Sequence, residues 1–207
     1  MNNKRTEIIF TSNSPYYIVN GEGETYKSDI PIKLKSVTPI CRCGQSKSMP
    51  YCDANHEKVG LKTGKSEDRS ESKWKDYTGE NIIVHFNLGL CCHAKVCITE
   101  LPSVFDVNER PWINADGASV DEIIEIVRKC PSGALTYTKD GEHVTDFDSV
   151  TNINIQNNGP IVVTGNVELI DDNNSIGELV SKQKYTLCRC GISKNKPFCD
   201  GGHIKKD

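Results

Sequence analysis

Large aromatic side chains are scarce in this sequence. Phe, Trp and Tyr make up 7% of its 207 residues, and apolar residues of all kinds reach only 36%. This composition is lean for one large hydrophobic core, so the length fits one or two ordinary domains or three small ones. Three small domains require metal sites that replace part of the missing core.

Long apolar runs and an excess of positive charge are also missing. No run approaches the roughly 20 residues that a membrane-spanning helix needs, and residues 1–7 lack the apolar centre of a signal peptide. The formal net charge of −3 argues against a dedicated nucleic-acid-binding protein. We therefore expect a cytoplasmic protein without a membrane or nucleic-acid partner, in which the cysteines stay reduced.

The motifs of several common enzyme classes are absent as well. The sequence has no glycine-rich nucleotide-binding loop, no G-x-S-x-G elbow and no H-E-x-x-H pair. These absences lead us to expect a protein that is not an enzyme.

Cysteine, by contrast, is abundant and recurs with histidine in a repeated pattern. The chain has 10 cysteines, and the pattern C-x-C-x8-C-x3-H occurs twice, 147 positions apart. Disulfide pairing gives no reason for a histidine to keep the same offset in both copies. The predicted metal ligands are Cys41, Cys43, Cys52 and His56 in the first copy and Cys188, Cys190, Cys199 and His203 in the second.

The spacing divides the donors of each copy into two pairs. A turn at Arg189 can bring Cys188 and Cys190 to one metal, and Cys199 and His203 share a face if a helix starts there. Two such pairs suit a two-iron cluster. Zinc is the alternative, because three thiolates and one imidazole also make a structural zinc site, although C-x-C pairs are uncommon in zinc modules.

Residues that frame the donors also recur in both copies. Asp200 would fall in the first turn of the predicted helix, where its carboxylate can accept hydrogen bonds from free backbone N–H groups. We expect hydrogen bonds around the ligands from the recurring residues Ser46, Asp53, Ser193 and Asp200. Basic residues near the sites are candidates for guiding an acidic redox partner; they are Arg42, Lys47, Arg189, Lys194 and Lys196.

Residues 188–203 closely resemble the CDGSH iron-sulfur domain of the mitoNEET-like proteins. The resemblance implies a 2Fe-2S cluster held by three cysteines and one histidine. The first copy keeps the ligands but has Ala54 and Asn55 where the family has a glycine and a small residue. A neutral imidazole in place of a thiolate removes one negative charge, so we expect raised reduction potentials and clusters that are lost in acid.

A second kind of site lies between the two copies. A short cysteine group at 91–97 and a remote Cys130-Pro131 form an arrangement typical of ferredoxins. Residues 74–138 resemble a divergent single-cluster ferredoxin-like domain, which implies that Cys91, Cys97 and Cys130 are ligands. Three cysteines suit a 3Fe-4S cluster, whereas a fourth ligand from Cys92 or His93 would complete a 4Fe-4S cluster.

Local patterns predict several elements. Residues 161–164 and 167–170 flank Gly165-Asn166 as a hairpin, and residues 31–37 alternate like a strand. In the middle, residues 81–86 and 134–138 read as strands, and Ser119 with Glu122 has the spacing of a capping box at the start of a helix that Pro131 ends. Residues 62–75 read as a linker and 171–177 as a surface loop.

Together these features predict an α+β protein of three units. Residues 1–68 and 146–207 form two small β-rich CDGSH-type units that we expect to pack as an internal pseudo-dimer, so that the chain can be monomeric. Residues 69–145 form the ferredoxin-like domain between them. The preferred function is a one-electron carrier with two 2Fe-2S clusters and one 3Fe-4S or 4Fe-4S cluster, serving a reductase or acceptor protein. The alternative is cluster storage, sensing or transfer to an apo iron-sulfur protein.

Overall fold

The first unit of the protein is an antiparallel sheet formed near the N-terminus. The computed structural model describes residues 5–22, 26–62, 64–147, 149–172, 176 and 181–206. The strands β1 (Glu7–Phe10), β2 (Tyr16–Val19) and β3 (Val37–Ile40) pair in that order. In β2, burial alternates so that Tyr16 and Ile18 face the core, as a strand with one covered face requires.

A second sheet is formed by residues near the other end of the chain. It contains β8 (Asn152–Ile155), β9 (Ile161–Thr164) and β11 (Lys184–Leu187), with β9 in the centre and all pairs antiparallel. The strand between β9 and β11 in sequence, β10 (Glu168–Asp171), does not join this sheet.

Strand β10 crosses instead to the N-terminal sheet. It pairs parallel with β1, with Ile8 opposite Leu169, so the predicted hairpin of residues 161–164 and 167–170 is wrong. The chain does turn at Gly165, but the next strand completes the open edge of β1 and buries Leu169 in the core there. A local turn signal does not determine which strand edge the following residues join.

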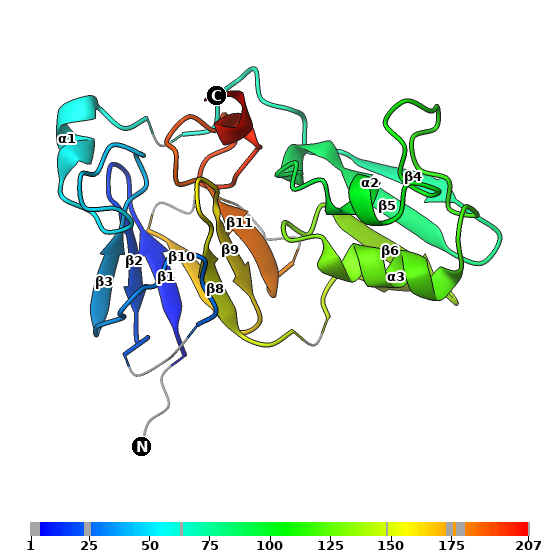
Figure 1. Ribbon diagram of the computed structural model, residues 1–207, viewed down its shortest axis with the longest axis horizontal. Helices are drawn as coiled ribbons and strands as arrows, with labels where there is room; N and C mark the ends of the chain where they lie inside the picture. The colour runs from blue at the N-terminus through cyan, green and yellow to red at the C-terminus, as the bar shows by residue number, and fades with distance from the viewer. Residues whose placement is uncertain are drawn as a thin grey trace.

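One hydrophobic core joins the two sheets. Its buried members come from both ends of the chain, so neither sheet covers its apolar face alone. These residues are Ile8, Phe10, Tyr16, Ile18, Leu34, Ile40, Ile153, Ile155, Ile161, Val163, Val167, Leu169, Tyr185 and Leu187. The sheets stand side by side in Figure 1, with the ligand loops at one end.

The central domain has its own sheet and core. Its strands β4 (Trp74–Thr78), β5 (Ile83–Asn87), β6 (Leu135–Lys139) and β7 (Glu142–Val144) lie in sequence order, and all pairs are antiparallel. Helices α2 (Val96–Glu100) and α3 (Val120–Lys129) pack together, and Ile123 and Val127 of α3 are fully buried. The predicted capping box is confirmed, because Ser119 and Glu122 exchange hydrogen bonds at the start of α3.

The remaining elements are short. The one-turn segments are η1 (Leu88–Leu90), α1 (Asn55–Val59) and η2 (Gly202–Lys206). The strand predicted over residues 31–37 is wrong, since the chain becomes a strand only at Val37. The predicted linker lacks regular structure from 62 to 73 where it is described, whereas Trp74 already belongs to β4. The loop predicted over 171–177 lies largely outside the described residues.

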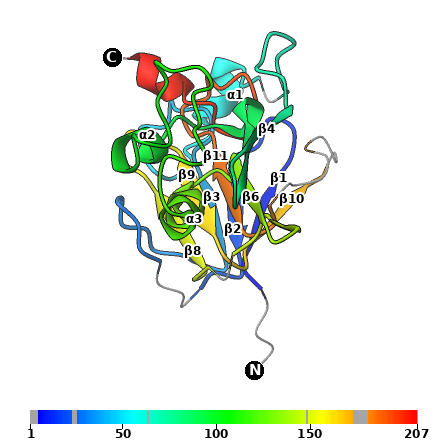
Figure 2. The same cartoon turned by 90° about the vertical axis from the view of Figure 1, so that its right-hand side faces the viewer.

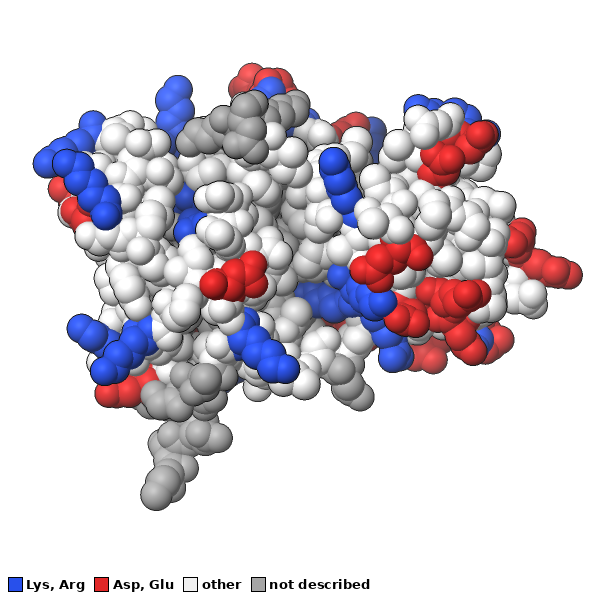
Figure 3. All heavy atoms as spheres, viewed as in Figure 1, with Lys and Arg blue, Asp and Glu red and all other residues white. Residues whose placement is uncertain are grey.

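The architecture is therefore mixed α+β, with the central domain beside the sheets (Figures 1 and 2). Acidic side chains gather over the central domain in Figure 3, and residues 69–145 carry 12 Asp and Glu against 8 Lys and Arg, a net charge of −4. Within the described residues, no helix has both the length and the apolar character that crossing a bilayer demands.

Candidate metal centres

The C-terminal copy places its first two thiols side by side. Strand β11 ends at Leu187, and the Sγ atoms of Cys188 and Cys190 lie 3.6 Å apart. Two thiolates bound at about 2.3 Å to one tetrahedral metal would be separated by about 3.8 Å. Cys188 and Cys190 therefore have the spacing of two ligands on one metal ion.

The second pair of the C-terminal copy has a similar separation. Cys199 Sγ and His203 Nδ1 are 3.5 Å apart, close to the separation of a thiolate and an imidazole nitrogen on one tetrahedral metal. The predicted helix does not start at Cys199, because η2 begins at Gly202 and Cys199 lies in the preceding loop. In that loop the Gly201 N–H donates to Cys199 Sγ at 3.4 Å, which stabilises negative charge on the sulfur.

The N-terminal copy reproduces this geometry. Cys41 and Cys43 have their Sγ atoms 3.7 Å apart, and Cys52 Sγ lies 3.3 Å from His56 Nδ1. The Ala54 N–H donates to Cys52 Sγ at 3.4 Å, as Gly201 does in the other copy. Ala54 has a φ of 64°, so it takes the same left-handed backbone conformation without being a glycine.

The framing residues join the two halves of each ligand loop. Asp53 accepts hydrogen bonds from the backbone N–H groups of Lys47 and Asn55, at 2.8 and 3.1 Å. Asp200 accepts from Lys194 and Gly202 in the same way, at 2.8 and 2.9 Å.

The two recurring serines have a parallel role in these loops. Ser46 donates to Tyr51 O at 2.6 Å, and Ser193 donates to Phe198 O at 2.7 Å. Each of these hydrogen bonds fixes the loop segment that directly precedes the Cys–His pair of its copy.

Four of the donor thiols in the two copies have raised pKa values. Burial raises the pKa of Cys199 to about 12, and a hydrogen bond from Cys190 together with burial raises the pKa of Cys188 well above its ordinary value. Burial also raises the pKa values of Cys43 and Cys52. Because a metal binds the thiolate, binding at these donors must release protons.

The two ligand loops contact each other through their backbones. Cys43 and Cys190 form an antiparallel β-bridge. A Cβ added to Gly44 would lie 2.5 Å from Cys190 O, and one added to Gly191 would lie 2.5 Å from Cys43 O. Both glycines also have positive φ angles, so this close approach requires glycine in both copies.

A tyrosine from the N-terminal sheet supports the C-terminal ligand loop. The hydroxyl of Tyr16 donates to Cys188 O at 3.1 Å and to Pro197 O at 3.0 Å. Sequence comparison of the copies aligns Tyr16 with Ile161, which has no hydroxyl and therefore cannot support the N-terminal ligand loop in the same way. This role was missed by sequence reasoning, although the Tyr16–Ile161 difference was visible.

The central cysteines gather in one pocket. Cys91, Cys92, Cys97 and Cys130 line it together with His93. Cys97 lies on α2, Cys130 caps the end of α3, and His93 is exposed.

Electrostatics also links these central thiols. Burial raises the pKa of Cys91 to about 12, and the neighbouring thiols of Cys130, Cys92 and Cys97 add to the effect. Burial, followed by the neighbouring Cys130 thiol, likewise raises the pKa of Cys92, while the hydroxyls of Thr186 and Ser132 act in the opposite direction. The sequence-predicted residues of the central site are thus brought together, and each one lines the same pocket.

The predicted guiding role is wrong for three of the five basic residues. Lys196 is buried and donates to Ser193 O, and the two arginines are buried as well. Arg42 is buried against the rings of Phe10 and Tyr16, and Arg189 donates to Gln156 O and Gly159 O. Their charges face the protein rather than an approaching partner.

All ten cysteines lie in the part of the chain that the structure describes, and none of them forms a disulfide. Within the described residues, no three or more His, Cys, Asp or Glu side chains converge as for one metal ion. The donors of each CDGSH-type copy are arranged as two pairs, which suits a two-iron cluster, because each iron then takes one pair.

Comparison with known families agrees with this geometry. The family described as "Iron-binding zinc finger CDGSH type" matches residues 13–57 and 158–204. The chain belongs to the CDGSH family. The family described as "Divergent 4Fe-4S mono-cluster" matches residues 77–140, between the two CDGSH regions.

Two curated relatives are similar to parts of this CDGSH protein. The uncharacterized protein YjdI of Escherichia coli K12 is 38% identical over 64 residues, which are 31% of this chain and 84% of YjdI. The CDGSH iron-sulfur domain-containing protein 3, mitochondrial, of Mus musculus is 59% identical over 27 residues, which are 13% of this chain and 20% of that protein. No solved structure matches significantly.

Proposed function

We propose that this CDGSH protein is a one-electron carrier with three iron-sulfur centres. The observation that carries the proposal is the pairing of donors in both copies, at separations of 3.3 to 3.7 Å. Bound iron-sulfur clusters accept and return single electrons, with potentials set by their ligands and surroundings.

In each CDGSH copy, the chain's own residues would hold a 2Fe-2S cluster. Cys188 and Cys190 serve one iron, and Cys199 and His203 serve the other; Cys41, Cys43, Cys52 and His56 do the same in the first copy. The backbone N–H groups of Gly201 and Ala54 donate to ligand sulfurs, which favours the more negative, reduced state.

In the central domain, Cys91, Cys97 and Cys130 are the proposed ligands. Cys92 lines the same pocket and is the available fourth thiolate for a 4Fe-4S cluster, whereas three ligands alone would give a 3Fe-4S cluster. The exposure of His93 makes it the weaker candidate.

The carrier is proposed to be a monomer whose two CDGSH copies form an internal pseudo-dimer. Support comes from the exchange of β10 into the N-terminal sheet, the shared core and the Cys43–Cys190 bridge. Its proposed partners are a reductase and an acceptor in the cytoplasm, where the ten cysteines, none of which forms a disulfide, stay reduced. Electron transfer between them involves no reaction of a bound substrate.

A redox titration of the anaerobically purified protein tests this proposal. We expect reversible one-electron reduction, followed by electron paramagnetic resonance, with all the iron still bound after several cycles. The competing function, cluster donation, would appear as iron loss on cycling and rapid transfer to an apo-ferredoxin. Irreversible reduction or the absence of any reducible centre would contradict the carrier function.

A further inference from the structure

The two CDGSH copies hold their donors alike but differ in what covers them. Strands β3 and β11 occupy equivalent positions, 147 residues apart. Val37 at the start of β3 is 51% exposed, whereas the equivalent Lys184 of β11 is 5% exposed. Pro39 is half-buried, whereas the equivalent Thr186 is 1% exposed. Strand β11 is therefore covered on a face that β3 leaves open.

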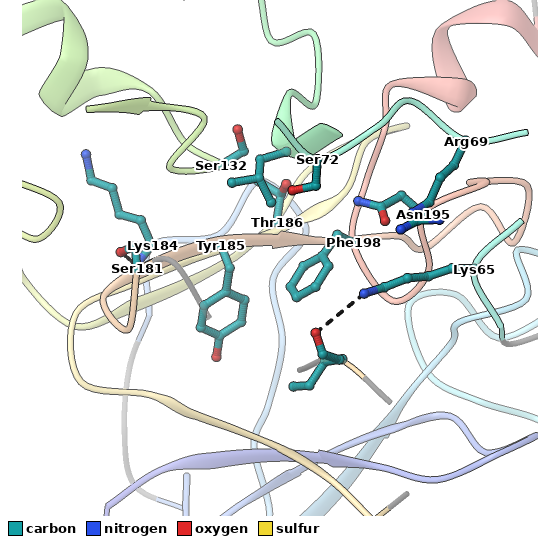
Figure 4. Close-up of a pocket in the computed structure, with 12 residues that line it drawn as sticks. Lys65, Arg69, Ser72, Ser132, Ser181, Lys184, Tyr185, Thr186, Asn195 and Phe198 are labelled. Atoms are coloured by element: carbon teal, nitrogen blue, oxygen red, sulfur yellow. Dashed lines mark hydrogen bonds between the residues drawn. The ribbon is translucent and has the colours of Figure 1, made fainter. Parts of the chain in front are cut away.

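The central domain provides this cover. The Lys184 ammonium donates to Arg128 O and lies 4.6 Å from the ring centre of Phe147, a residue just past the 69–145 segment that packs in the core of the central domain. Thr186 and Asn195 line one pocket between the units. Ser132, which belongs to the central domain, lines the same pocket (Figure 4).

A buried hydrogen bond continues this contact along the ligand loop. The Asn195 side chain donates from Nδ2 to Gly89 O at 2.7 Å. The first copy has Ser48 at the equivalent position, where it is exposed. The C-terminal copy thus has a longer amide side chain at a position where it can donate to a central-domain carbonyl.

The most informative difference is at Gly201. A Cβ on Gly201 would lie 2.8 Å from His93 Cδ2 and 3.1 Å from Cys92 O. The backbone itself does not require glycine, because Ala54 stands at this position in the first copy with a φ of 64° and an exposed side chain. Gly201 is needed because the Cys92–His93 peptide packs directly on it.

We propose that Lys184, Thr186, Asn195 and Gly201 form a docking platform, here called the junction, that seats the Cys92–His93 peptide on the C-terminal ligand loop. The first copy has Val37, Pro39, Ser48 and Ala54 at these positions and lacks the platform. The junction makes the central donor set the immediate neighbour of the C-terminal donor set, and not of the N-terminal one.

The junction gives the three donor sets a definite order. The N-terminal and C-terminal sets meet at the Cys43–Cys190 bridge, and the C-terminal and central sets meet at the junction. The C-terminal copy therefore lies between the other two, as the ribbon also shows (Figure 1). The next step rests on the carrier function proposed above. One electron that crosses the junction oxidises the iron-sulfur centre held by one donor set and reduces the centre held by the other donor set.

A matched pair of variants tests the junction in the iron-loaded full-length protein. Gly201→Asn places a side chain against His93, and Ala54→Asn places the same side chain at the equivalent exposed position. Asparagine is chosen because it tolerates the left-handed backbone conformation better than other side chains. Hydrogen exchange of the Cys92 and His93 amides reports docking. Electron paramagnetic resonance of the fully reduced protein reports magnetic interaction between the central and C-terminal centres.

We expect Gly201→Asn to lose amide protection at Cys92 and His93 and to lose the magnetic interaction, while Ala54→Asn keeps both. Asn195→Ala, with Ser48→Ala as its control, provides a second test that leaves the loop backbone unstrained. Unchanged protection and magnetic interaction in both Gly201→Asn and Asn195→Ala would overturn the junction. If wild-type centres cannot be reduced, the carrier function fails, and hydrogen exchange still tests the docking itself.

Discussion

Tyr16→Phe is expected to weaken the C-terminal ligand loop from a distance. Tyr16 belongs to the N-terminal strand β2, yet its buried hydroxyl donates to Cys188 O and Pro197 O. Burial raises the pKa of Tyr16, so the hydroxyl keeps its proton and remains a donor over the accessible pH range. The phenylalanine variant keeps the ring and its packing but leaves the two carbonyls without this donor.

The expected loss of stability depends on which carbonyl oxygens lose their hydrogen-bond donor. Pro197 O also accepts the Cys188 N–H at 2.8 Å, so it stays satisfied, and the main cost falls on Cys188 O. One buried group left without its hydrogen bond costs about 1 to 2 kcal/mol. In a protein of this size that corresponds to a decrease of roughly 2 to 8 °C in the melting temperature.

Tyr185→Phe is the matched control. Its hydroxyl is also buried and donates to one carbonyl, Val167 O at 3.1 Å, but that carbonyl lies outside the ligand loops. Both variants should therefore melt at lower temperature. Only Tyr16→Phe should release the iron of one two-iron centre early, as followed by a ferrous chelator and the visible absorbance. Equal iron-release rates in the two variants would refute the support that we assign to Tyr16.

Three further changes test other parts of the account. His203→Cys should lower the reduction potential of the C-terminal centre, on the order of 100 mV, because a second thiolate adds negative charge; an unchanged potential in a redox titration would count against imidazole ligation. Leu169→Ala should cost about 2 to 5 kcal/mol in urea unfolding, because Leu169 is buried where β10 joins β1, whereas the exposed Val150→Ala should cost almost nothing. Burial, reinforced by His85, lowers the pKa of His143 below its ordinary value of 6.5. The folded protein therefore resists protonation, and the associated stability is present above about pH 6.5 and lost as the pH falls through the folded-state pKa. Between pH 7.5 and 5 the melting temperature of wild type should fall further than that of His143→Gln, and equal decreases would contradict this reasoning.

The donor geometry could be anticipated from the sequence because it is local. Each set of four donors lies within 16 residues, and a two-residue spacing such as Cys188–Cys190 constrains the sulfurs through a single turn. The detail that failed was the helix start at Cys199, since η2 begins three residues later. The left-handed residue Gly201 precedes η2 and lets the loop present Cys199 before any helical turn forms.

The strand exchange could not be anticipated in the same way. Residues around Gly165 satisfy the local signature of a hairpin, and the turn does form there. What decides the partner of β10 is the unfilled edge of β1, about 160 positions earlier in the chain, and the core that both sheets share. Such long-range pairing has no signal in a single sequence.

The sequence shows that Ala54 departs from the family pattern, but it does not show why the two copies differ at this position. In sequence, Ala54 looks like the exceptional residue and Gly201 like the ordinary one. In the structure, the loop accepts either residue, and Gly201 is the position with an additional demand because His93 packs on it. That demand depends on where the central domain sits, which follows only from tertiary structure.

The central claim is that paired thiolates and imidazoles at both ends of the chain hold sulfide-bridged iron. Its most direct test is the content of iron, acid-labile sulfide and zinc in protein purified without oxygen. We predict about seven or eight irons per chain, with comparable sulfide and little zinc, from two 2Fe-2S clusters and one 3Fe-4S or 4Fe-4S cluster. A colourless protein that contains zinc but no labile sulfide would contradict the account.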